Sequence, residues 1–70
     1  MTRVSHESFT ARLNQELQHH PQVQSRNLDL RVVHDENGYH LAGKDAEGNA
    51  GIFAEVWLRA SEKYDFGKLL

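Results

Sequence analysis

A chain of 70 residues that contains no cysteine must be stabilised by side-chain packing or by association with another chain. A single core in a domain this small usually contributes only about 3–5 kcal/mol, and many such domains add disulfides, metals or partners. Disulfides and thiolate zinc sites are excluded because both require cysteine. We therefore expect one small domain over residues 1–70 with a tendency to form a homodimer.

The charge pattern argues against a dedicated nucleic-acid binder and against a membrane protein. Eight Lys and Arg are scattered among ten Asp and Glu, for a formal net charge of −2. Proteins that follow phosphate backbones usually concentrate basic side chains on one face. The longest apolar stretch runs only from Ile52 to Ala54, so no segment suits a bilayer span. The N-terminal residues lack a signal sequence, so the expected location is cytoplasmic.

The segment from Ser5 to His19 is predicted to be a helix. Ser5 can act as its N-cap, with Val4 placed before it for a hydrophobic staple. Apolar residues then recur at helical spacing: Phe9, Leu13 and Leu17. Pro21 is expected to end the helix, and the polar residues 22–27 are expected to form a connection.

Residues 28–42 are predicted to form a β-hairpin. Apolar and polar residues alternate on both sides of a turn at residues 35–38, where Asn37 and Gly38 favour positive φ. The expected register places Val32 opposite Leu41 and Val33 opposite His40. The inner face is then apolar: Leu28, Leu30, Val32, Tyr39 and Leu41. His34 and His40 are expected on opposite faces, which argues against a metal site shared by the two.

Residues 50–60 fit two structures. A strand has one apolar face (Ile52, Ala54, Val56 and Leu58), whereas a helix has one polar stripe (Gly51, Glu55, Arg59 and Glu62). Nearby glycines and the content of β-branched and aromatic residues favour the strand. The preferred fold is α+β, with the N-terminal helix packed on a three-stranded antiparallel β-meander and a short C-terminal helix or tail, which Ser61 can cap. The alternative is an α-β-β-α order with residues 50–64 helical.

No combination of residues indicates catalysis, a cofactor or a metal. His19 and His20 point in different directions on a helix, and Glu16 with His19 is a single Glu-x-x-His where di-iron sites need two. The serines lack a nucleophile motif, and the glycines lack the spacing of a phosphate loop. We predict that the chain is not an enzyme.

One surface has the composition of an interaction hot spot. In the three-stranded sheet, the face opposite the helix collects aromatic, apolar and basic side chains: Arg31, Val33, His40, Phe53, Trp57 and Arg59. Exposed apolar patches of this kind usually bind something. In the helix alternative Phe53 and Trp57 belong to the core instead, and residues 64–70 provide a third possibility by folding over the face.

This surface predicts a small non-catalytic protein-interaction module. Its expected role is to regulate or inhibit a larger protein, and self-association through the same face is expected as well. The alternative function is a nucleic-acid-binding domain, with the aromatic side chains stacked on bases and Arg31 and Arg59 on phosphates. Steep salt dependence of binding would distinguish the second function from the first.

Overall fold

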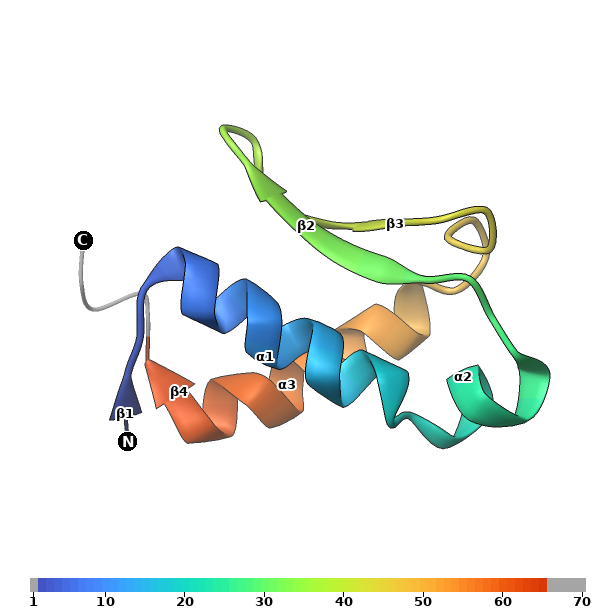
Figure 1. Cartoon of the computed structure of the whole chain (residues 1–70), viewed down its shortest axis with the longest axis horizontal. Coiled ribbons are helices and arrows are strands. Elements are labelled where there is room, and N and C mark those ends of the chain that lie inside the picture. Colours follow the sequence, from blue (N-terminus) through green and yellow to red (C-terminus); the bar gives the residue numbers. More distant parts are fainter. Residues whose placement is uncertain (1, 66–70) are drawn as a thin grey trace.

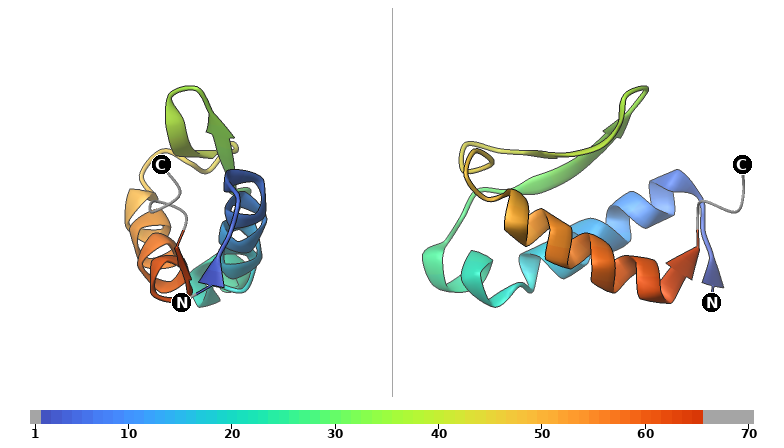
Figure 2. Two further views of the ribbon diagram at one scale, coloured as in Figure 1. Left: turned by 90° about the vertical axis from the view of Figure 1, so that its left-hand side faces the viewer. Right: turned by 180° about the vertical axis from the view of Figure 1, so that it is seen from behind.

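The computed structural model describes the backbone of residues 2–65 and the side chains of residues 4–63. Its elements follow in this order: β1 (Thr2–Arg3), α1 (His6–Gln18), α2 (Pro21–Arg26), β2 (Arg31–Asp35), β3 (Gly38–Ala42), α3 (Ala50–Lys63) and β4 (Tyr64–Asp65). The helices α1 and α3 lie side by side in one layer, and the β2–β3 hairpin crosses above them (Figures 1 and 2). The short strands β1 and β4 pair in parallel. The class is α+β, as predicted.

The structure confirms the predicted N-terminal helix. Ser5 is the N-cap, and its side-chain oxygen accepts a hydrogen bond from the backbone N–H of Ser8 at 3.1 Å. The predicted apolar positions are all completely buried: Phe9, Leu13 and Leu17. The helix therefore presents one narrow apolar stripe to the rest of the molecule.

The polar connection predicted after Pro21 is wrong, because these residues form the short helix α2. Proline is well suited to the first helical position, where its missing N–H has no partner to lose. His20 caps this helix, and its Nδ1 accepts from the backbone N–H of Gln22 at 3.2 Å. Asn27 ends it in the left-handed conformation, at φ 52°.

The hairpin has the predicted register. Val32 lies opposite Leu41 and Val33 lies opposite His40. The first strand begins later than expected, at Arg31, whereas the Asp35–Gly38 pair extends both strands by one residue into the predicted turn. Gly38 adopts a φ of 104° there, a conformation that glycine tolerates.

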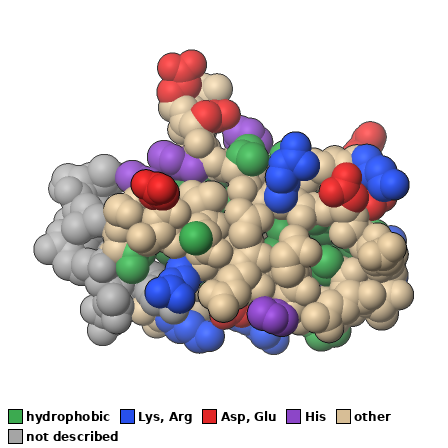
Figure 3. Space-filling view, in the orientation of Figure 1, with side chains coloured by type: hydrophobic (Ala, Val, Ile, Leu, Met, Phe, Trp, Pro, Cys, Tyr) green, Lys and Arg blue, Asp and Glu red, His purple; other side chains and the backbone are tan. Residues whose placement is uncertain are grey.

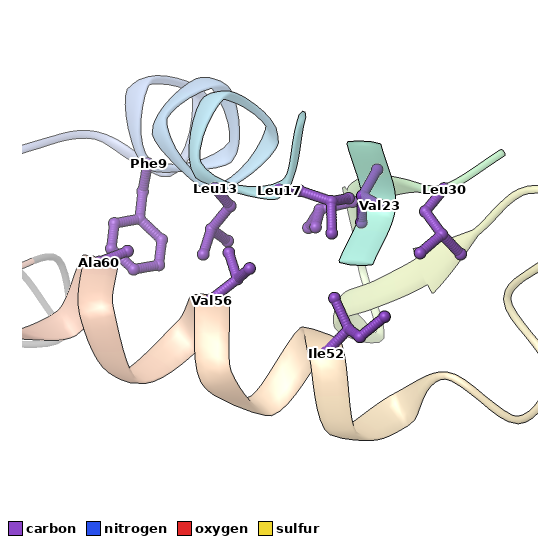
Figure 4. Close-up of a cluster of buried hydrophobic side chains, with 9 residues drawn as sticks. Phe9, Leu13, Leu17, Val23, Leu30, Ile52, Val56 and Ala60 are labelled. Carbon is purple, nitrogen blue, oxygen red and sulfur yellow. The ribbon is translucent and has the colours of Figure 1, made fainter. Parts of the chain in front are cut away.

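The predicted third strand is wrong: residues 50–63 form α3, close to the 50–64 of the helical alternative. The main sheet therefore has two strands. Helical spacing places Ile52, Val56 and Ala60 together against α1 and leaves Leu58 64% exposed (Figure 4). Ser61 lies inside α3 and does not cap a closing helix. The predicted C-terminal helix or tail otherwise falls on residues 66–70, outside the described residues.

The core lies between the two long helices and the inner face of the hairpin (Figure 4). Among the described side chains, the buried apolar residues come from both long helices, α2, β2 and the segment before β2: Phe9, Leu13, Leu17, Val23, Leu30, Val32, Ile52, Val56 and Ala60. Leu30 directly precedes β2, and Leu41 of β3 packs against the cluster from its margin. The hairpin is thus held over the helices by one face, and its other face is turned away from them.

Candidate interaction surface

The predicted interaction surface is divided in two by the fold. Arg31, Val33 and His40 lie on the outer face of the hairpin, as expected. The other members belong to α3, on the inner side of the hairpin: Phe53, Trp57 and Arg59. Because residues 50–63 are helical, they do not form the third strand that would have carried these side chains to the outer face. The six residues do not form a single surface.

Phe53 and Trp57 line the flank of α3 that faces the hairpin. The Trp57 ring meets the rings of Phe9 and Tyr39 edge-on, with centroids 5.4 Å and 5.3 Å away. The Phe53 ring lies 6.1 Å from that of Trp57. Both side chains are half-buried and pack against the core. Their positions at the margin of the core agree with the helical alternative for residues 50–60.

The two predicted arginines are not brought together. Arg31 lies on the outer face of the hairpin, whereas Arg59 is exposed on α3. Arg59 lies one turn after Glu55, whose carboxylate is 2.6 Å from His20 Nε2, on the flank away from Trp57. The pair therefore provides no common basic patch for a phosphate backbone.

A cluster of polar aromatic side chains, which the sequence did not predict, joins α1 to the hairpin. The rings of His6 and His34 are stacked, with centroids 4.6 Å apart, and His6 Nδ1 is 2.7 Å from the hydroxyl of Tyr39. Burial raises the pKa of Tyr39, and a hydrogen bond with Thr10 opposes part of this effect. Nothing in the local spacing could have paired His6 with His34, because they lie on different elements.

The outer edge of β2 is covered by amide side chains from α1. Asn14 Nδ2 donates to the Val32 carbonyl at 2.9 Å, and Asn14 Oδ1 accepts from the Val32 N–H at 2.9 Å. One turn later, Gln18 Nε2 donates to the carbonyl of Leu30 at 2.9 Å. These side chains occupy positions that a neighbouring strand would otherwise use.

The opposite edge, formed by Gly38–Ala42 and called the β3 edge here, has no such cover at its centre. Because the backbone groups of Val32 point to α1, Val32 and Leu41 are a non-hydrogen-bonded pair, and the N–H and C=O of Leu41 point outward. Within residues 2–65, neither group has a hydrogen-bond partner. The β3 edge also lacks the Lys, Glu or Pro that often protects an edge strand.

The apolar core is incompletely covered on the same side of the molecule. Leu41, Ala46 and Phe53 are only partly buried, although all three pack against the core. By contrast, charged side chains gather on the projecting tip of the hairpin (Figure 3), where Asp35 and Glu36 are exposed. The β3 edge and the neighbouring flank of α3 thus combine open backbone groups with half-buried apolar side chains.

The described part of the chain offers no other kind of site. It contains no pocket and no group of three or more His, Asp or Glu side chains arranged to hold a metal ion. None of its helices combines the length and the apolar character needed to cross a bilayer. The β3 edge is therefore the strongest candidate site in these residues.

Comparison with known proteins found no match: no family model, curated protein or solved structure resembles the chain significantly. No residue role can be transferred from a relative.

Proposed function

We propose that the chain is a small non-catalytic protein-interaction module that binds by strand addition at the β3 edge. The observation that carries this proposal is the contrast between the two edges of the hairpin. Asn14 and Gln18 occupy the β2 edge, whereas the N–H and C=O of Leu41 stay open on the β3 edge. A role as regulator or inhibitor of a larger protein agrees with this mode of binding.

Strand addition matches the chemistry of this edge. Main-chain hydrogen bonds supply affinity when a peptide extends a sheet, and side chains on alternate positions supply specificity. An added strand would bond to Leu41 and would also cover apolar area near Phe53, which is half-buried on the adjacent flank of α3. Both contributions favour binding. The backbone groups exchange water for hydrogen bonds to the added strand, with a small net gain, and the apolar side chain is removed from water.

The test uses a capped peptide of alternating Thr and Val as a probe strand. We expect millimolar peptide to slow amide hydrogen exchange at Leu41 and to shift its NMR resonance. The amide of His40 points into the hairpin, so its exchange should change little.

A matched pair of variants makes the test specific. Leu41→Pro removes the outward N–H without breaking the hairpin ladder, because proline is tolerated where an edge N–H faces solvent. Leu41→Val shortens the side chain and keeps the N–H. The peptide should bind the valine variant and not the proline variant. Equal binding to both, or no protection of Leu41 at saturating peptide under conditions where the chain is monomeric, would overturn the proposal.

A further inference from the structure

We infer that the strand added at the β3 edge is β3 of a second copy of this chain, paired antiparallel about a two-fold axis at His40. This inference rests on the proposed function and names the partner of that site. It joins two hairpins into a four-stranded sheet in the order β2-β3-β3-β2. The pairs of α1 and α3 helices then lie beneath one continuous sheet.

The register follows from the length of β3 and the direction of its backbone groups. The strand spans Gly38–Ala42, so His40 is its centre, and only an axis at His40 keeps all five residues of both copies paired. In this register Leu41 of each copy lies opposite Tyr39 of the other. Outward-pointing residues thereby meet as hydrogen-bonded pairs, as the antiparallel pattern requires.

A register shifted toward Leu41 fits the backbone less well. It would require Gly43 to join the ladder, but Gly43 has a φ of 114°, far from strand conformation. The carbonyl of Gly43 also accepts a hydrogen bond from the backbone N–H of Ala46 at 3.2 Å. The loop therefore ends the strand at Ala42 and favours the axis at His40.

The charge of the β3 edge suits a second copy. Its residues carry no carboxylate, ammonium or guanidinium group, so two copies can approach without opposed Lys, Arg, Asp or Glu side chains on the paired strands. The charged side chains of the two strands, Arg31 and Asp35, both belong to β2 and stay at the outside of the four-stranded sheet. A strongly charged strand of another protein would find no side chain of opposite charge on β3.

The distribution of apolar area supports the same partner. Leu41 and Phe53 are half-buried on the β3 side of the core, whereas the β2 side is closed by Asn14 and Gln18. The two-fold axis brings the incompletely covered sides of two molecules together. This added burial matters, because stable interfaces need about 1,000 Å² or more and a five-residue strand alone is short.

Single-cysteine variants test the register directly, because the chain has no cysteine of its own. In the proposed dimer the two His40 residues form a non-hydrogen-bonded pair with Cα atoms about 4.5 Å apart, within the range of about 4.4–6.8 Å that a disulfide accepts. The matched control is Ala42→Cys, on the same face of the same strand. Ala42 lies opposite Gly38, so the two Ala42 residues are separated by about 13 Å along the strands.

We expect His40→Cys to form a disulfide-linked dimer under diamide at least tenfold faster than Ala42→Cys. The otherwise unmodified chain should sediment as a dimer in the micromolar to near-millimolar range. Leu41→Pro should weaken dimerisation by about tenfold for each hydrogen bond that it removes, and Leu41→Val should weaken it much less.

The outcomes separate this inference from the proposed function. A chain that remains monomeric at near-millimolar concentration, or equal cross-linking of the two cysteine variants, overturns the two-fold dimer. If the Thr–Val peptide still protects Leu41 in that case, the β3 edge remains a binding site for another protein. If the peptide also fails, the proposed function is overturned as well.

Discussion

The side chain of Asn14 forms both hydrogen bonds that a neighbouring strand would make to Val32. Its Nδ2 and Oδ1 atoms each lie 2.9 Å from their backbone partners on β2. One side chain of α1 therefore anchors the hairpin to the helical layer and also prevents strand pairing at this edge. The asymmetry between the two edges of the hairpin has its origin in this contact.

Asn14→Ala should destabilise the fold by about 2–3 kcal/mol, because both backbone groups of Val32 lose their partner in a partly buried position. Gln18→Ala is the control. It removes a single bond to Leu30, and the effect should be about 1 kcal/mol. Urea denaturation measures both. Equal and small effects would show that Asn14 does not hold the hairpin.

His20 should carry its proton on Nε2. Its Nδ1 accepts from Gln22, and its Nε2 lies 2.6 Å from Glu55, so the tautomer with Nε2–H satisfies both contacts. Nitrogen NMR of the imidazole reads this directly. His20→Ala should cost about 1–2 kcal/mol through loss of the cap. Glu55→Gln should cost less than about 1 kcal/mol, because Glu55 is 65% exposed. A proton on Nδ1 would contradict the arrangement.

Gly43→Ala should destabilise the chain by more than about 3 kcal/mol. A Cβ atom there would overlap the carbonyl oxygen of Asp29, and the residue has a positive φ, so a steric clash adds to the backbone strain. Gly48→Ala separates the two causes, because Gly48 has a φ of 86° but open space around it. Its cost should stay near 1–2 kcal/mol, on the order expected for the left-handed conformation. Equal thermal and urea stabilities of the two variants would refute the clash.

Stability should fall in alkaline solution as Tyr39 loses its proton. Burial raises the pKa of Tyr39 in the folded state above its ordinary 10.0, so the folded chain holds this proton more tightly than the unfolded chain does. The contribution of this group to the free energy of unfolding is fully present below pH 10 and is lost as the pH rises beyond that value.

The ultraviolet difference spectrum between the unmodified chain and Tyr39→Phe isolates this titration. Thr10→Val should raise the pKa of Tyr39 further, because the hydrogen bond with Thr10 lowers it. A Tyr39 that titrates at or below pH 10 would show that the ring is not shielded from water in the folded chain.

The conformation of residues 50–63 could not be derived from their own pattern. Ile52 and Val56 satisfy both an apolar strand face and an apolar helix stripe, so local periodicity did not separate the two. Packing against α1 selected the helix, which buries Ala60 and leaves Leu58 64% exposed. This difference changed the candidate site, because Phe53 and Trp57, which were expected on the outer sheet face, lie at the margin of the core.

Patterns among near neighbours in the sequence were sufficient to predict the capped helix that begins at His6 and the register that pairs Val32 with Leu41. The reason is that capping, helical spacing and strand alternation depend on residues a few positions apart. The open β3 edge required the fold itself. It follows from contacts such as Asn14 with Val32, where 18 positions separate the partners, and no local pattern specifies which strand edge a distant helix will cover.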